Sequence, residues 1–352
     1  MPTGRMNREQ FFGQLAALDE QRLKKALWNL YWRGSAAMRE RIEAEVNPEQ
    51  HAGGKRPSKD LVDAQLLLGE VADFAALARS GAYMAGDRRV SPRERTCWRL
   101  TFKRLVSDAE DGLRGQDATA AATALEQLID LACETRDYEY FRSEDPMAAA
   151  GFVVSDAVAL LWASLQAQHG FAGFAQRAAP QLIRWESRYG WTRSGYGRVG
   201  EKETSLASVL ARMLPAPDMW VGFTDRYLDA LDRVARDDSA RPSRTWTPMD
   251  RSRDRRTADL AEWHRLLLDR LVGSEAEGRL DRLASHPALG GPELEFLKAQ
   301  LAHRRGDLSN ARSLVHSALH QLPGHQDFLD FSTEIGGPIP PRALQIASER
   351  SR

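Results

Sequence analysis

The chain has 352 residues with 49 basic and 49 acidic side chains, so its formal net charge is zero. This balance disfavours binding of nucleic acid or a membrane surface by the chain as a whole, but it leaves local basic patches open. Hydrophobic residues make up 42% and charged residues 28%, which excludes a disordered chain and indicates a folded globular protein.

Two further features point to the cytoplasm. The chain holds only Cys97 and Cys133, which cannot form a disulfide framework or a Cys-rich zinc site and suit a reducing compartment. The N-terminus lacks the apolar run of a signal peptide, and no window approaches the roughly 18 apolar residues of a membrane span. We therefore expect a cytoplasmic protein that does not cross a membrane.

Residues 1–47 predict an N-terminal helical module. Apolar residues recur at helical spacing from Phe11 to Leu18, and Asp19 can cap the helix that follows. The dipeptide Asn47-Pro48 breaks the pattern, and residues 48–59 are polar and rich in Gly and Pro. We expect these residues to form a linker.

Residues 60–240 predict a helical array. Its clearest helix start is Ser91-Pro92-Arg93-Glu94, where Ser91 can cap, Pro92 suits the first turn and Glu94 completes a capping box. Another start at Asp145-Pro146 opens a helix that is expected to stop at His169-Gly170. The next helix is expected to meet a kink or boundary at Pro180.

The remaining residues divide into three expected segments. Residues 241–257 are rich in Arg and Pro and indicate a second linker. Residues 258–335 predict the C-terminal helices. Residues 336–352 open on the sequence GGPIPP and are expected to form a tail that begins rigid and extended.

The most informative pattern lies at residues 294–323. Small, turn-forming and terminating residues fall where the tetratricopeptide consensus has them: Ala299, Gly306, Ala311, Ala318 and Pro323. The segment therefore resembles one tetratricopeptide-type repeat. The expected fold is all-α, an array of antiparallel helical hairpins of the kind that can wind into a superhelix. Such arrays bind other molecules and usually do no chemistry.

A second resemblance involves other parts of the chain. Residues 115–141 and 153–165 look like the helical repeat region of bacterial SWIM-type zinc-finger proteins, and residues 11–46 resemble the helical module often found beside it. The resemblance implies a helical, bacterial protein. The zinc motif of that family, Cys-x-Cys followed by Cys-x-His, is absent, so no functional residue carries over.

A basic stretch at residues 88–104 suggests an alternative function. Seven basic residues face only one acid there, and Arg95, Arg99 and Lys103 recur at i, i+4 and i+8. Such a stripe could follow a phosphate backbone. Residues 108–145 hold eleven acids against three arginines, so the two stretches could instead neutralise one another.

Two other stretches supply candidate contacts. Residues 241–256 carry six arginines and Trp246, which suits either base stacking or a solvated linker. Residues 190–203 contain a GxGxxG pattern, but no strand is predicted before it, so we interpret it as an interhelical loop that could contact a partner. The candidate partner or nucleic-acid contacts are Arg88, Arg89, Arg95, Arg99, Lys103, Arg193, Arg198, Arg251 and Arg253.

Metal and catalytic motifs are weak or missing. His316 and His320 lie at i and i+4 as metal ligands would, with His303 or His325 as a third ligand. No acid or HExxH motif accompanies them, so we expect a solvated helix face and no metal or other cofactor. The sequence also lacks GxSxG and any recognisable nucleophile and base pair.

The sequence thus favours a non-enzymatic cytoplasmic interaction or scaffold protein that binds a protein partner through a helical-repeat surface. The alternative is a nucleic-acid-associated accessory protein that uses residues 88–104 and 241–256. An enzyme with an unrecognised all-α site ranks third.

Overall fold

A computed structural model describes residues 13, 19–33, 63–84, 89–189, 199–240 and 260–350. The chain divides into two compact units, residues 1–61 and 62–352. All regular structure among the described residues is helical, in fourteen helices, and none of these residues forms a strand. The prediction of an all-α protein is confirmed for this part of the chain.

The first unit contributes one described helix, α2 (Glu20–Arg33). Asp19 accepts a hydrogen bond from the backbone N–H of Arg22 at 2.7 Å, as expected for the cap of this helix. Trp28 stacks on Tyr31 and on Trp32, with ring centroids 5.7 Å and 5.8 Å apart.

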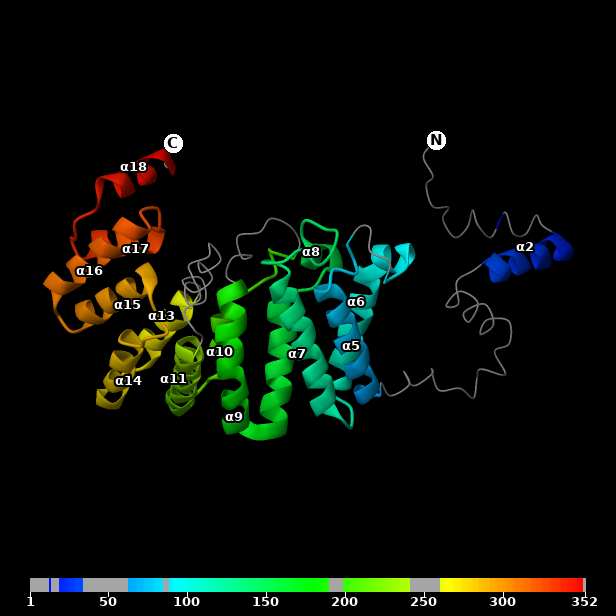
Figure 1. Ribbon diagram of the computed structural model, residues 1–352, viewed down its shortest axis with the longest axis horizontal. Coiled ribbons are helices and arrows are strands. Elements are labelled where there is room, and N and C mark those ends of the chain that lie inside the picture. The colour runs from blue at the N-terminus through cyan, green and yellow to red at the C-terminus, as the bar shows by residue number, and fades with distance from the viewer. Residues whose placement is uncertain are drawn as a thin grey trace. The chain divides into compact units, whose positions relative to one another are not determined.

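The second unit contains the other helices, and the packed pairs are close to one another in chain order (Figure 1). Their bounds are α5 (Ala64–Arg79), α6 (Pro92–Gly112), α7 (Ala118–Glu134), α8 (Pro146–Ala150), α9 (Val154–Tyr189), α10 (Leu206–Met213), α11 (Pro217–Ala240), α13 (Ala261–Arg270), α14 (Ser274–Ala284), α15 (Gly291–Arg304), α16 (Leu308–Gln321), α17 (Gln326–Glu334) and α18 (Pro341–Arg350). No helix among the described residues is long and apolar enough to span a bilayer.

The predicted capping box at the start of α6 is confirmed. The backbone N–H of Glu94 donates to the Ser91 hydroxyl at 3.2 Å, and the Glu94 carboxylate accepts from the Ser91 N–H at 2.8 Å. Two backbone donors at the start of the helix are thereby satisfied, which fixes where α6 begins. This position decides which α6 residues face the core.

The helix predicted from Asp145 to His169 is interrupted. Its first turn, α8, ends at Gly151, which has a φ of 63° that favours glycine, and a new helix begins at Val154. The carboxylate of Glu203 accepts from the backbone N–H groups of Val154 and Ser155 at 2.7 Å and 3.0 Å. A cap from a distant residue therefore starts α9, and this contact cannot be read from local sequence.

The helix α9 folds back on itself at Gly170. Gly170 has φ 64° and ψ −175°, a conformation that only glycine adopts readily. The indole N–H of Trp162 donates to the side-chain oxygen of Gln181 at 2.8 Å, although 19 residues of straight helix would span about 28 Å. Residues 154–169 and 171–189 are therefore two arms of a hairpin, here called the first arm and the second arm.

The expected stop at His169-Gly170 is thus confirmed, whereas Pro180 does not end the second arm. The helix continues through Pro180 to Tyr189, and Gly170 is the position in α9 with non-helical dihedral angles. A proline costs the helix one backbone hydrogen bond and crowds the preceding turn. Packing of the buried neighbours Ala178, Ala179 and Leu182 against the rest of the core compensates for that loss.

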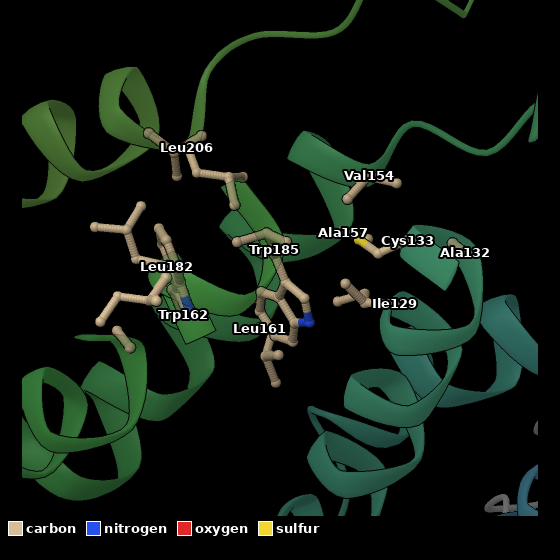
Figure 2. Packing of buried hydrophobic residues seen from close by; sticks show 14 of the residues in the cluster. Ile129, Ala132, Cys133, Val154, Ala157, Leu161, Trp162, Leu182, Trp185 and Leu206 are labelled. Carbon is tan, nitrogen blue, oxygen red and sulfur yellow. The ribbon is translucent and has the colours of Figure 1, made fainter. Parts of the chain in front are cut away.

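The core between α7 and the two arms of α9 is built around two tryptophans (Figure 2). Trp162 and Trp185 are fully buried together with Ile129 of α7. The indole N–H of Trp185 donates to the Asp130 carboxylate at 2.7 Å, so this ring is bound to α7 as well as packed on it. The second arm is therefore held firmly between α7 and the first arm.

The main core continues past residues 241–259. Trp263 of α13 stacks on Trp220 of α11 with ring centroids 5.6 Å apart, and it meets Phe223 edge-on. The buried hydroxyl of Tyr227 lies 2.8 Å from His264 Nε2. The helices on either side of the predicted 241–257 linker, which lies outside the described residues, therefore share one core.

A second apolar cluster lies in α15 to α18. The turn between α15 and α16 contains Gly306 at a φ of 81°, and Ala299, Ala311 and Ala318 are completely buried in this cluster. These are the small residues that the repeat pattern placed at a close helix crossing. In the segment expected to be a tail, residues 341–350 form α18, and Ala343 is buried in the same cluster.

Candidate functional site

Two basic surfaces lie among the described residues, and the sequence predicted one of them. Arg95, Arg99 and Lys103 lie on α6, where Arg99 and Lys103 are exposed and Arg95 is half-buried. We call these three residues the α6 stripe. Within the described residues, none of the three forms an ion pair or a side-chain hydrogen bond.

No ion pair among the described residues joins the acidic stretch at residues 108–145 to the α6 stripe. Its acids pair with arginines elsewhere: Glu134 with Arg79 at 2.8 Å, Asp108 with Arg104 at 3.1 Å, and Glu126 and Asp130 with Arg184 at 2.6 Å and 3.0 Å. Arg104, the one member of the basic stretch in these pairs, lies outside the stripe. None of these pairs therefore neutralises Arg95, Arg99 or Lys103.

The other predicted contacts do not join the α6 stripe in a described site. Arg89 donates to the backbone carbonyl of Ser80 at 2.5 Å and so stabilises a turn after α5. The remaining predicted contacts lie outside the described residues: Arg88, Arg193, Arg198, Arg251 and Arg253.

Lys103, at one end of the stripe, lines a cleft of about 370 Å³ between α6 and the start of α9. Glu110, Asp156 and Lys202 line the same cleft. Burial and then the nearby Asp156 raise the pKa of the Glu110 carboxyl above its ordinary value, while Arg114 opposes the shift. Two bases and two acids offset one another here, so this cleft has no net preference for an anion.

The second basic surface is a larger cleft of about 690 Å³. It is bordered by α7, the second arm of α9 and α11, and we call it the α9 cleft. Three arginines and one carboxylate line it, namely Arg177, Arg184, Arg233 and Glu126, with His169 at the end of the first arm. Its volume falls within the range of ligand-binding sites in proteins.

One end of the α9 cleft is neutralised by pairing. Arg184 forms ion pairs with Glu126 and Asp130 of α7. Burial raises the pKa of the Asp130 carboxyl, and the Arg184 guanidinium offsets this shift only in part. Arg184 is therefore occupied with holding the second arm against α7.

The other end of the α9 cleft keeps its positive charge. Arg177 and Arg233 are exposed, and neither forms an ion pair within the described part of the chain. Gly173 lets His169 approach closely, because a Cβ atom at Gly173 would lie 2.5 Å from His169 Cβ. The turn at Gly170 thus places His169, at the end of the first arm, in the lining of the same cleft as Arg177.

Gln181 presents an oriented hydrogen-bond donor in the α9 cleft. Its side chain is only 4% exposed, and its oxygen must be the atom that accepts from Trp162, because an indole N–H can only donate. The amide nitrogen therefore points away from Trp162, and it has no hydrogen-bond partner among the described residues. Gln181 lines the cleft, so this donor is available there.

Pro180 adds an acceptor to the same wall. Proline lacks a backbone N–H, so the carbonyl of Gln176, four residues earlier, loses its usual helical donor. Gln176 and Pro180 both line the α9 cleft. The wall therefore combines the oriented donor of Gln181 with a backbone acceptor at Gln176.

The described histidines form no metal centre. No group of three or more possible ligands is present among the described residues. His316 Nδ1 lies 3.0 Å from the carbonyl oxygen of Pro338, and its Nε2 lies 3.2 Å from His320 Nε2, so this pair is held by hydrogen bonds. The predicted third ligands contact other side chains, since His303 meets Phe331 edge-on and His325 stacks on Phe328.

Other histidines that contact polar groups are structural. Burial lowers the pKa of His264, which faces Tyr227, to about 3. His286 Nδ1 accepts from the Ala288 N–H at 3.2 Å, so its Nε2 donates to Asp232 at 3.0 Å and ties the turn after α14 to α11. Neither histidine has a nucleophilic side chain and an open cavity beside it among the described residues.

Sequence reasoning missed the α9 cleft. A local signal was present, because Gly173, Arg177, Gln181 and Arg184 recur at helical spacing on one face of the second arm. The contributions of His169 and Arg233 depend on the turn at Gly170 and on the packing of α11, and no local pattern encodes them. Comparison of the chain with models of protein families, with curated proteins and with solved structures finds no match.

Proposed function

We propose that this protein is a non-enzymatic cytoplasmic scaffold, an array of antiparallel helical hairpins that binds a protein partner. The folded-back α9 and the α15–α16 pair joined at Gly306 support the hairpin array. The observation that carries the binding role is the α9 cleft, which three packed helices hold open with unpaired polar groups on its walls. Rigid walls lower the entropic cost of ordering a bound segment.

The test is capture of the partner from the cells that make the protein. The cleft variant combines Arg177→Glu with Arg233→Glu. The control variant combines Arg265→Glu with Arg342→Glu, which makes the same charge change at exposed residues outside both basic surfaces.

We expect one protein to co-purify in stoichiometric amount with the wild type and the control variant but not with the cleft variant. Retention of the partner by a folded cleft variant would contradict a binding role for the cleft. Turnover of a substrate by the purified wild type would contradict the non-enzymatic assignment.

A second candidate function is association with nucleic acid, which the unpaired charges of the α6 stripe favour. Binding through this stripe would weaken steeply with salt, because each phosphate contact releases counterions. Replacing Arg95, Arg99 and Lys103 together by Glu would abolish it. Wild-type binding to DNA or RNA at physiological salt that this triple change removes would favour this second function over the scaffold.

A further inference from the structure

We propose that the α9 cleft binds an extended, acidic segment of the partner protein, an inference that rests on the proposed function. The segment would lie along the second arm from Gly173 to Arg184. Its carboxylates would meet Arg177 and Arg233, and its backbone would bond to the Gln181 amide and the Gln176 carbonyl.

Charge selects an anionic occupant. Arg177 and Arg233 have no acidic partner among the described residues, and His169 lines the same cleft. Glu126, the one acid among the described residues of the lining, is already paired with Arg184. A carboxylate is a suitable ligand because a planar guanidinium can bind both of its oxygens.

Hydrogen-bonding capacity selects a peptide over a simple anion. A phosphate or sulfate ion can use the arginines and the Gln181 amide, but a fully ionised one has no donor for the Gln176 carbonyl. A peptide backbone carries both an N–H and a C=O at each residue. It can therefore satisfy both the donor and the acceptor on this wall.

The length of the wall suits a short extended segment. Gly173 and Arg184, both in the lining, are eleven residues apart in the second arm, which corresponds to about 16 Å of helix. An extended chain rises about 3.3 Å per residue, so about five residues would fit along it.

The lining also argues against single-stranded nucleic acid. Proteins that bind single strands combine basic residues with aromatic side chains on which the bases stack. Among the described residues that line the α9 cleft, none is Phe, Tyr or Trp. The bases would therefore find no stacking platform there.

The test is fluorescence anisotropy of the full chain with a labelled hexaglutamate peptide at about 100 mM salt, where the Debye length is about 10 Å. Labelled hexaglutamine and labelled hexathymidylate are the comparison probes. We expect hexaglutamate to bind at least about tenfold more tightly than either, a difference of about 1.4 kcal/mol. Equal binding of hexaglutamine, or tighter binding of hexathymidylate, would overturn the proposal.

Substitutions locate the binding. The cleft variant should weaken hexaglutamate binding by at least about 30-fold, because it replaces the two arginines without an ion pair in the described part of the chain by acids of the same charge as the peptide. The control variant should leave the affinity within about twofold, as expected for charges that are screened at this salt. Equal weakening by the two variants would show non-specific attraction and overturn the proposal.

A third variant, Gln181→Glu, tests the oriented amide. The carboxylate still accepts from Trp162, so the core hydrogen bond is kept, but the donor in the cleft is lost. We expect about a tenfold weaker affinity for hexaglutamate, because the hydrogen bond to the peptide backbone is lost and a negative charge takes its place beside an acidic ligand. Unchanged affinity in a variant with wild-type circular dichroism would overturn this role of Gln181.

A negative result in the peptide assay and a negative result in the cell capture have different meanings. If a partner depends on the cleft in cells but hexaglutamate does not bind, the acidic-segment inference is wrong and the scaffold function stands. If hexaglutamate binds through the cleft but no cellular protein is captured, the scaffold function fails and the anion preference of the cleft stands.

Discussion

The α6 stripe and the α9 cleft are both basic, but they are built in different ways. The stripe comes from one helix whose polar face repeats Arg95, Arg99 and Lys103 on successive turns. The cleft comes from three elements, and other side chains fix the groups in it: Trp162 orients Gln181, and Asp130 holds Arg184. The stripe is a charged surface, whereas the cleft has a defined shape.

Because of this difference, the two surfaces should recognise different kinds of ligand. Charges on an exposed helix face attract many anions and are screened by salt. Donors and acceptors fixed on a packed wall favour a ligand that matches their positions, because a mismatched ligand leaves polar groups unsatisfied. We therefore expect specificity from the cleft and, at most, non-specific attraction from the stripe.

Gly170→Ala is the substitution expected to affect the two surfaces most differently. An alanine at φ 64° and ψ −175° is strained, and we expect a loss of about 1–3 kcal/mol in the free energy of unfolding. Relief of that strain would displace the second arm of α9, which forms one wall of the cleft, while α6 keeps its own core contacts. Urea denaturation and hexaglutamate binding measure both effects.

Gly69→Ala is the matched control for this change. Gly69 lies inside α5, and no neighbouring atom lies within 4 Å of the position that a Cβ would occupy there. The alanine should therefore stabilise the helix by about 0.5–1 kcal/mol. If Gly170→Ala were as harmless as Gly69→Ala, the fold-back would not depend on the glycine conformation.

Arg184→Gln tests the neutralised end of the cleft. We expect a loss on the order of 1 kcal/mol in the free energy of unfolding at pH 7, a small value because Arg184 is partly exposed. A carboxyl with a raised folded-state pKa, such as Asp130, binds its proton more tightly in the folded chain. Its ionisation therefore lowers stability as pH rises above about 4. Removing Arg184 raises that pKa further, so the loss should be larger at pH 7 than at pH 4.

Denaturation curves at the two pH values check this prediction. A loss that is equal at pH 4 and pH 7 would mean that Asp130 does not need the charge of Arg184.

The smallest effect is expected at the α6 stripe. Replacing Arg95, Arg99 and Lys103 together by Glu should change the free energy of unfolding by less than about 0.5 kcal/mol, because these side chains form no ion pairs among the described residues. Thermal denaturation at about 150 mM salt, where the Debye length is about 8 Å, measures the change. A larger loss would show that the stripe helps to hold the fold together.

The same contrast explains what could be predicted from the sequence. Local signals specified the capping box at Ser91, the stop at Gly170 and the buried small residues Ala299, Ala311 and Ala318, because each depends on residues a few positions apart. The stripe belongs to this class. Local signals could not show whether the stripe is paired with acids, because the acids of residues 108–145 pair with Arg79 and Arg184 on other helices.

The missed features all depend on long-range packing. The second arm continues through Pro180 although its local preference is to break there. The start of α9 depends on Glu203, 49 residues away from Val154. The cleft needs the fold-back at Gly170 and the position of α11 before His169, Arg177 and Arg233 can surround one space.

The stacking of Trp220 on Trp263 has a consequence for how the chain could be divided. These rings, with Phe223 and Tyr227, join α11 to α13 through side chains, on either side of residues 241–259. Each large buried side chain contributes about 1.5–3 kcal/mol, so the contact does not rely on a peptide bond between the two helices. Two fragments that are made separately, one ending with α11 and one beginning before α13, should therefore reassemble through these side chains.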